Sequence, residues 1–525
     1  SGFGRIQIVG GDSDLAYVVA EHWYRWMHGL EGWRDLPYFH PVQGTLGYTD
    51  AQALFAPPYV IFRALGADMF LALQLVAVVV VAIGYVSTYV LLRRHLRVRV
   101  GFALVGAVAY SCSNALAIKA FHMNTLGVEF VPLIVLLGCE GVRAMRAGRA
   151  TAAVVWSGAA GLLWGLLFFT SYYSAWFSVV VAFAVLIVGV LLAPRRALAF
   201  ARRRRGDVRR WLPSCVASAA AFAVGVLPFL LTSIPVLRES GGRSWSEVLG
   251  FLARPSDVFN LGHANLVWGG ITWPGTTPAE SVERALAVTP LLAVGAIVGV
   301  VLLRVLEGRQ PGMGCTARTR WLTAALLASF ALTALSWRFG DHSAWKVLWA
   351  IVPGGRAIRA VDRVQLVLSF VYVVVWAAAM DGLWTRLGTS SPRVRLLGCA
   401  AIVALSVGVL VEQVTTQVPK GFDHAVRQAS LDAVAAPPTR CRSFVVIDPE
   451  GRFTAERAQL QSMVLAVHLG LPTLNGDSGN VPPGWNLWTP SDPRYPEAVQ
   501  RWAVDHGLDP DTVCAFDLDT GQWVP

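Results

Sequence analysis

The sequence predicts a polytopic α-helical membrane protein that carries a small α/β domain at its C-terminus. Of its 525 residues, 55% are hydrophobic and only 15% are charged, whereas a soluble domain carries about 25% charged residues. The charges lie in short stretches between long apolar runs, which is typical of a chain that crosses a bilayer repeatedly. The net charge of +11 is spread over these short stretches. A nucleic-acid-binding protein gathers its basic residues on one face, so we expect no nucleic-acid partner.

Ten apolar segments approach the roughly 20 residues that a helix needs to cross the hydrocarbon core. They cover about 69–92, 100–118, 125–142, 151–171, 174–193, 212–235, 286–304, 321–338, 363–383 and 396–413. The chain begins with Ser-Gly and shows no signal peptide. Because residues 1–68 precede the first span on the predicted outer side, an upstream helix would bring the number to eleven.

Arginine sets the predicted orientation of these spans. The connections after the first, third, fifth, seventh and ninth spans are rich in arginine and poor in acids: 93–99, 143–149, 195–210, 304–320 and 386–395. The positive-inside rule makes them cytoplasmic. The other connections then face outward from a bacterial cytoplasmic membrane: 1–68, around 119–124, around 172–173, 236–285, 339–362 and the tail from about 414.

The chain therefore divides into a transmembrane domain, 1–413, and an extracytoplasmic soluble domain, 414–525. In the second, 443–447 and 512–518 read as strands and 455–469 and 493–506 as helices. Cys441 and Cys514 flank the two strands and are the only cysteines predicted outside the membrane on the outer side. In an oxidising compartment they are candidates for a disulfide.

The first outer loop, 1–68, contains four carboxylates: Asp12, Asp14, Glu21 and Asp50. From Asp14 onward its pattern predicts an amphipathic helix in the membrane interface, with its tryptophans toward lipid headgroups. A carboxylate held near a hydroxyl can act as a general base, and partial desolvation raises its pKa toward the useful range. We expect Asp12, Asp14 or Asp50 in this role, and Glu21 and His22 in positioning the acceptor.

Plainer roles fit the same residues. Asp12 or Asp14 can cap the helix, Glu21 can pair with Arg25 four residues on, and His22 can form an interfacial hydrogen bond. The string Asp-Ser-Asp also matches the metal–nucleotide pattern of soluble glycosyltransferases. It is only three residues long, and it lies on the wrong side of the membrane for a nucleotide sugar.

The later outer loops supply cations. Arg356, Arg359 and Arg363 suit a lipid-linked phosphate, because guanidinium forms bidentate bonds with phosphate oxygens. His122 and His263 are further candidates, and headgroup anchoring or pairing with a nearby aspartate is the alternative. No Walker A loop, HExxH, CxxC or nucleophile elbow is present, so ATP-driven transport, zinc proteolysis and serine hydrolysis have no sequence support. We expect that no cofactor is required; a divalent metal is compatible with the sequence but not indicated by it.

Several motifs occur in an order that resembles bacterial GT-C-type membrane glycosyltransferases, from Gly11 to Trp485. They are GDSD, EHWYRW, LPYFHP, GTLGYTD, FHMN, GRAIRAVDRV and LNGDSGNVPPGW. The resemblance implies an enzyme that takes a sugar from a polyprenyl-phosphate carrier at the outer membrane face. It also implies a first-loop acid as base or acceptor-positioning group, here Asp12 or Asp14 and then Asp50, and a soluble domain that helps bind the acceptor.

We therefore expect an inverting transfer of a sugar to a cell-envelope glycan or lipid. One alternative is a polymerase or ligase that uses a lipid-linked glycan as donor. Another is a non-enzymatic transporter or flippase, for which inverted repeats and mid-membrane charges are typical; the spans contain few such charges. A third is a scaffold for envelope assembly in which the carboxylates are only caps and ion pairs.

Overall fold

The computed structural model describes residues 5–6, 12–119, 122–195, 208–271, 284–309, 316–416 and 421–524. Within these residues, helices occupy all ten predicted spans: α3 (Met69–Val90), α4 (Val100–Ser111) with α5 (Asn114–Ile118), α6 (Phe130–Arg146), α7 (Ala150–Thr170), α8 (Tyr172–Leu191), α10 (Val208–Ser240), α13 (Pro290–Gly308), α14 (Ala317–Leu335), α16 (Val364–Leu387) and α17 (Pro392–Val411). Nine of the spans in the described chain are long and apolar enough to cross a membrane. The exception is α14, whose first turns carry Arg318 and Arg320.

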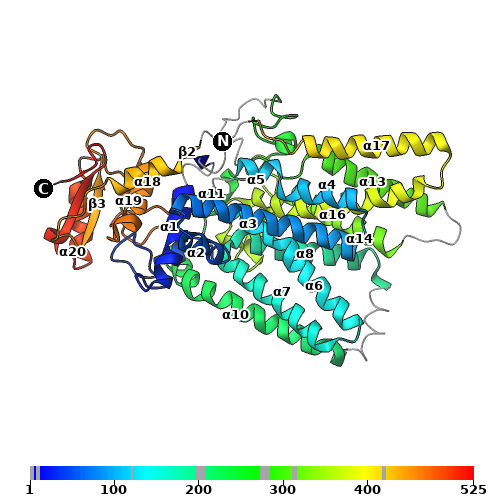
Figure 1. Ribbon diagram of the computed structural model, residues 1–525, viewed down its shortest axis with the longest axis horizontal. Helices are drawn as coiled ribbons and strands as arrows, with labels where there is room; N and C mark the ends of the chain where they lie inside the picture. The colour runs from blue at the N-terminus through cyan, green and yellow to red at the C-terminus, as the bar shows by residue number, and fades with distance from the viewer. Residues whose placement is uncertain are drawn as a thin grey trace.

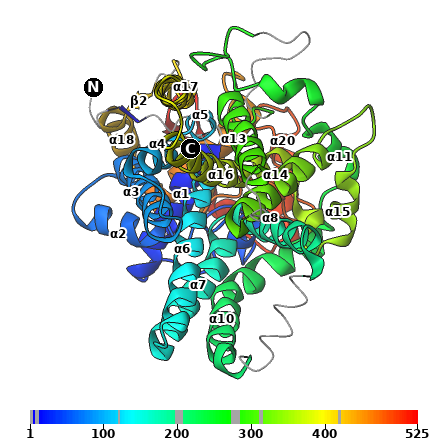
Figure 2. The same ribbon diagram turned by 90° about the vertical axis from the view of Figure 1, so that its right-hand side faces the viewer.

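The bundle is organised around α16, which lies near the centre of the end-on view (Figure 2) and is buried along most of its length. At the periphery, α7 and α10 run side by side (Figures 1 and 2). A Cβ at Gly161 of α7 would lie 2.1 Å from the carbonyl oxygen of Ser218 on α10. Small residues let helix backbones approach closely inside a membrane, so this glycine sets the α7–α10 contact.

One end of the bundle collects the arginine-rich connections. Glu140 accepts from Arg94 at 2.7 Å and from Arg143 at 2.8 Å. Arg210, at the start of α10, donates to the carbonyl oxygen of Met145 at 2.8 Å. The connections after the first, third and fifth spans therefore meet at the same end.

The remaining basic connections join that end through two further carboxylates. Asp381 pairs with Arg99 at 3.1 Å and lies 3.8 Å from Arg318. Glu307 pairs with Arg386 at 3.2 Å. The arginine-rich connections that the sequence predicts on one side of the membrane thus lie together at one end of the fold. We call this end the basic end and define it by Glu140, Asp381 and Glu307.

The C-terminal region lies at the opposite end, coloured orange to red in Figure 1. It contains α18 (His424–Asp432), β3 (Ser443–Ile447), α19 (Ala455–Leu469), α20 (Tyr495–Asp505), β4 (Val513–Asp517) and β5 (Gln522–Trp523). The sheet order is β3-β4-β5, with β3 parallel to β4 and β4 antiparallel to β5. Both predicted strands and both predicted helices are confirmed, and so is the disulfide between Cys441 and Cys514.

Backbone hydrogen bonds join this region to the first loop. Phe39 N donates to Asn475 O and His40 N to Thr473 O, each at 2.9 Å. The Trp502 indole donates to His40 O, also at 2.9 Å. Near the N-terminus, β1 (Arg5–Ile6) pairs with β2 (Phe422–Asp423). The first loop and the C-terminal region therefore pack as one surface over the end of the bundle.

Helix α1 (Asp12–Met27) differs from the predicted interfacial helix. It begins at Asp12, and it packs against α19, α2 (Ala56–Ala64) and α3. Trp23 is buried and donates to the carbonyl oxygen of Ala51 at 2.6 Å. Within α1, only Asp12 and the last turn, with Trp26 and Met27, are exposed. The amphipathic pattern arises because α1 lies between the bundle and the C-terminal region.

Candidate active site

A cavity of about 1440 Å³ lies between the bundle, the first loop and the C-terminal region. Its apolar part is a groove between α8, α10 and α14, lined by Phe183, Ile187, Val226, Phe229 and Leu332 among others. Its polar part is lined by side chains from the first loop, the η3 turn (Met123–Glu129) with the residue before it, the segment after α10, the segment before α16 and the C-terminal region. Those side chains include Asp12, Asp50, His122, Asn124, Arg243, Arg359, Arg363, Glu456, Asp477 and Asn480.

Asp12 stands at the N-terminus of α1 and faces this polar part. Its carboxylate lies 2.6 Å from Nδ1 of His122, and about half of its side chain is exposed to the cavity. Burial of the carboxyl opposes ionisation, but the hydrogen bond and charge of His122, with Arg363 and Arg359, hold the pKa of Asp12 below its usual value. Asp12 is therefore ionised at neutral pH.

Asp50 is held more tightly than Asp12. Asn124 donates to its Oδ2 at 2.7 Å, and the backbone N–H of Tyr172, at the start of α8, donates to its Oδ1 at 3.0 Å. Burial raises the pKa of Asp50, although these hydrogen bonds and Arg363 oppose the rise. Asp50 thus ties the first loop to two other elements of the polar wall.

Two of the three predicted arginines line the cavity. Arg363 stacks over the ring of Tyr173, 5.2 Å from its centroid. Its Nε is buried and has no hydrogen-bond partner among the described residues. Arg359 lies 3.5 Å from Glu247. Arg356 does not line the cavity, and its guanidinium lies over the ring of Trp349.

Arg243 and Asp477 also line the cavity, although neither is predicted from the sequence as a site residue. Arg243 donates to the carbonyl oxygen of Gly479 and to Glu247, so it connects the segment after α10 with the C-terminal region. Asp477 lies in the LNGDSGN motif, which marks the resemblance but does not by itself indicate a site. Both residues reach the cavity through packing between distant segments, which no local pattern reveals.

Several other predicted site residues lie away from the cavity. Asp14 is buried and pairs with Arg427 of α18 at 2.8 Å. His22 is fully buried, with its Nδ1 2.9 Å from Glu31. His263 is exposed on the loop after η5 (Pro255–Phe259) and does not line the cavity. Asp14 and His22 thus join α1 to its neighbours.

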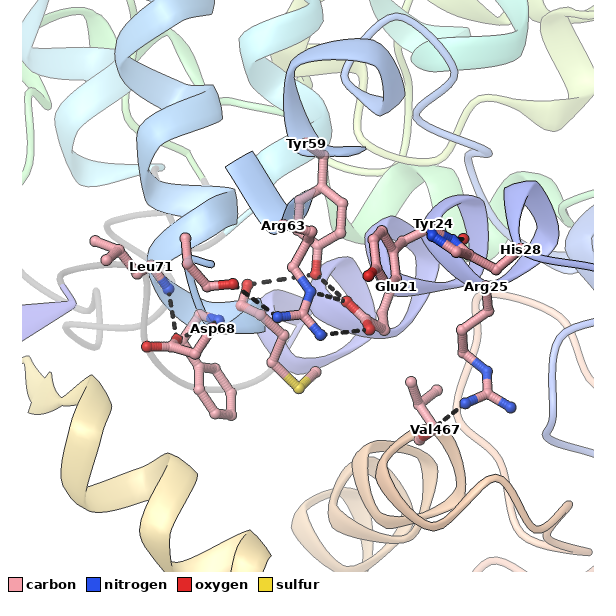
Figure 3. A network of polar contacts seen from close by, with 12 residues as sticks. Glu21, Tyr24, Arg25, His28, Tyr59, Arg63, Asp68, Leu71 and Val467 are labelled. Atoms are coloured by element: carbon pink, nitrogen blue, oxygen red, sulfur yellow. Dashed lines mark hydrogen bonds and ion pairs between the residues drawn. The ribbon is translucent and has the colours of Figure 1, made fainter. Parts of the chain in front are cut away.

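Glu21 belongs to a polar network on the side of α1 that faces α2 (Figure 3). Arg63 donates to both carboxylate oxygens of Glu21, at 2.8 and 2.9 Å, and the Tyr59 hydroxyl donates at 2.6 Å. The predicted pair with Arg25 does not form, because Arg25 instead pairs with Glu31 and donates to Val467 O. Glu21 therefore holds α1 against α2, outside the cavity lining.

Comparison with known proteins gives a remote likeness. The chain matches no family model and no curated protein. It is similar in fold to ArnT from Cupriavidus metallidurans bound to undecaprenyl phosphate, with a TM-score of 0.44 and 12% identity over 99% of this chain and 86% of that one. The apo state of that ArnT gives a TM-score of 0.44 and 11% identity over 98% and 90%. The polytopic helical character of the chain follows from its own spans, nine of which in the described residues are long and apolar enough to cross a membrane.

Proposed function

We propose that the chain is a membrane glycosyltransferase, which transfers a sugar from a polyprenyl-phosphate carrier to a cell-envelope glycan or lipid. The observation that supports this most is the two-part cavity. Carboxylates and arginines line one part, and apolar side chains of α8, α10 and α14 line the other. A lipid-linked phosphosugar has the same two parts, because its prenyl chain needs an apolar groove and its phosphate needs cationic donors.

We propose that the cavity opens at the outer face of the bacterial cytoplasmic membrane. The arginine-rich connections meet at the end opposite the C-terminal region, and the positive-inside rule puts that end in the cytoplasm. The Cys441–Cys514 disulfide supports the same orientation, because disulfides persist in oxidising compartments.

In the proposed reaction, the acceptor hydroxyl attacks the anomeric carbon of the donor in a single inverting step. The new bond joins the acceptor oxygen to that carbon, the bond from the carbon to the phosphate oxygen breaks, and the acceptor's O–H proton passes to a carboxylate of the polar wall. Polyprenyl phosphate leaves with the electron pair. Arg359 and Arg363 line the cavity, and their guanidinium groups stabilise the negative charge that develops on the leaving phosphate.

The first-loop carboxylates take different parts in this reaction. Asp12 is ionised and faces the cavity beside His122, so it accepts a hydrogen bond from the acceptor hydroxyl and orients it. Asp50 uses both oxygens within the protein wall, so it positions Asn124 and the start of α8. Asp14, Glu21 and His22 hold α1 in place and do not contact the substrate.

The test is a transfer assay with the purified full chain and a panel of polyprenyl-phosphate sugars, which measures release of polyprenyl phosphate and labelling of an envelope glycan or lipid fraction. We expect transfer by the wild type, little transfer by Asp12→Asn, and wild-type transfer by Asp505→Asn. Asp505 is an exposed aspartate of α20 outside the cavity lining, which makes it a matched control. Transfer only from a lipid-linked oligosaccharide would assign the chain to the polymerases or ligases instead.

A further inference from the structure

The segment 475–480 forms the part of the cavity wall that the C-terminal region supplies. The backbone N–H of Val446 donates to Oδ1 of Asn475 at 2.8 Å, and Nδ2 of Asn475 donates to the Tyr495 hydroxyl at 2.8 Å. These two hydrogen bonds fix the Asn475 side chain. Gly476 packs against the ring of Phe39, where a Cβ would lie 2.4 Å from a ring carbon. The backbone that carries Asp477 is therefore held in place before any substrate arrives.

The other side of this segment is tied to the bundle. The Ser478 hydroxyl donates to the carbonyl oxygen of Tyr48 at 2.5 Å. Arg243 donates to the carbonyl oxygen of Gly479. Asp477 directly precedes these two anchors in the chain and lines the same cavity as Asp12. The first loop, the segment after α10 and the C-terminal region thus all contribute to the position of one carboxylate.

The Asp477 carboxylate has no structural task that the fold reveals. It makes no hydrogen bond or ion pair with any residue in the part of the chain that the structure describes, whereas Asp14 pairs with Arg427 and Asp448 caps a turn through Arg452 N. A half-buried carboxylate without a partner destabilises a fold. Its retention at the cavity wall therefore points to a ligand.

We propose that Asp477 is a further catalytic residue, which takes the proton of the acceptor hydroxyl as that hydroxyl attacks the donor. This inference rests on the proposed glycosyl transfer. The acceptor O–H bond breaks and its proton goes to a carboxylate oxygen of Asp477. The acceptor oxygen bonds to the anomeric carbon, and polyprenyl phosphate leaves toward Arg359 and Arg363. Asp12 stays ionised and orients the hydroxyl.

The electrostatics around the two acids support this division of roles. Burial, the charge of Asp12 and the charge of Glu456 raise the pKa of Asp477 to about 7, and Arg359 opposes the rise. The pKa of Asp12 is lowered. A general base is most effective when its pKa lies near the working pH, and a pair of acids whose pKa values are pushed apart divides the acid–base work. The charged and titratable groups that face Asp477 are Asp12, Glu456, Arg359, Arg243 and Tyr38.

The experiment compares wild type, Asp477→Asn, Asp477→Glu and the control Asp505→Asn as full chains. It measures transfer from pH 5 to 9 and binding of undecaprenyl phosphate alone. Wild-type kcat/KM should rise with pH, reach half of its maximum near pH 7 and level off above that, because the base must lose its proton. Asp477→Asn should lower kcat by about 10²-fold and remove this rise, while carrier binding stays within about twofold. Asp477→Glu should restore part of the rate together with the rise.

The outcomes separate the two proposals. If Asp477→Asn keeps the wild-type kcat, or if its kcat/KM still rises with pH as in the wild type, the role of Asp477 is overturned and the proposed glycosyl transfer still stands. If Asp477→Asn also loses carrier binding, Asp477→Glu decides: restored transfer supports the role, and inactivity overturns it. If the wild type transfers from no polyprenyl-phosphate sugar, the proposed function falls and the role of Asp477 falls with it.

Discussion

Carboxylates and arginines occur at both ends of the helical bundle, but their surroundings differ. At the basic end, Glu140 is enclosed by Arg94, His95 and Arg143. At the cavity end, Asp12 and Asp477 face an open volume of about 1440 Å³. Charges that pair with one another stabilise a particular packing of helices, whereas charges that face a cavity keep their capacity to interact with a ligand. The surroundings of a charged residue therefore separate site residues from structural ones better than its residue type does.

The largest expected effect comes from the two aspartates at the start of α1, Asp12 and Asp14. Asp12→Asn should lower transfer by about 10²-fold, because the acceptor hydroxyl loses the carboxylate that orients it and a small misplacement of a reacting group can cost that much, with little change in the thermal unfolding midpoint. Asp14→Asn should lower the unfolding midpoint and leave transfer per folded molecule nearly unchanged, because it breaks the pair with Arg427 that holds α1 to α18. Transfer rates and unfolding midpoints of both variants test this. Equal activity losses in the two variants would contradict the distinction.

The next effect concerns the cation proposed to bind the donor phosphate. Arg363→Lys keeps the charge but removes the planar fork that matches a phosphate. We expect KM for the donor to rise about 10-fold to 10²-fold, while the unfolding midpoint changes little. Arg356→Lys is the matched control, since Arg356 lies over Trp349 outside the cavity lining. A larger effect at Arg356 than at Arg363 would show that the phosphate binds elsewhere.

At the basic end the expected effect is on stability alone. Glu140→Gln leaves Arg94 and Arg143 without their carboxylate partner, and because both arginines are about half exposed, solvent screens the loss and the cost should be on the order of 1 kcal/mol. The unfolding midpoint in detergent should fall, while transfer per folded molecule stays at the wild-type level. A loss of transfer without a loss of stability would show that Glu140 acts in the reaction and not only in the packing of the basic end.

Hydropathy and arginine placement predict the helices and their grouping because both depend on the bilayer, which acts on each segment separately. The strands around 443–447 and 512–518 and the Cys441–Cys514 disulfide are also predictable, because the patterns that indicate them are local. The sequence predicts the helix α1 correctly but places its tryptophans toward lipid headgroups, whereas most of the helix is covered by protein, because an amphipathic pattern does not distinguish the two surroundings. In α1, Trp23 reaches Ala51 and Glu21 reaches Arg63.

The site itself is only partly predictable. Asp12 and Asp14 are two residues apart and indistinguishable by type, yet one faces His122 and the other Arg427. The structure brings Asp477 close to Asp12 across more than four hundred residues of chain. Such proximity follows from the packing of the C-terminal region on the first loop, which no periodicity or spacing in a single sequence encodes.

The smallest expected effect is a gain in stability when Asp477 is replaced. Burial and the neighbouring acids raise its pKa in the folded protein from 3.8 to about 7, so the folded state binds the proton more tightly than the unfolded state does. The carboxyl therefore destabilises the fold increasingly as pH rises from about 4 to about 7, and by a constant amount above that. Solvent in the open cavity screens the charge, so we expect Asp477→Asn to stabilise the protein on the order of 1 kcal/mol at pH 8 and less at pH 5. Thermal unfolding at the two pH values measures the difference, with Asp505→Asn as the control that should show none. A stability loss at pH 8 would mean that Asp477 holds the fold together, and it would then belong with Glu140 on the structural side of the comparison.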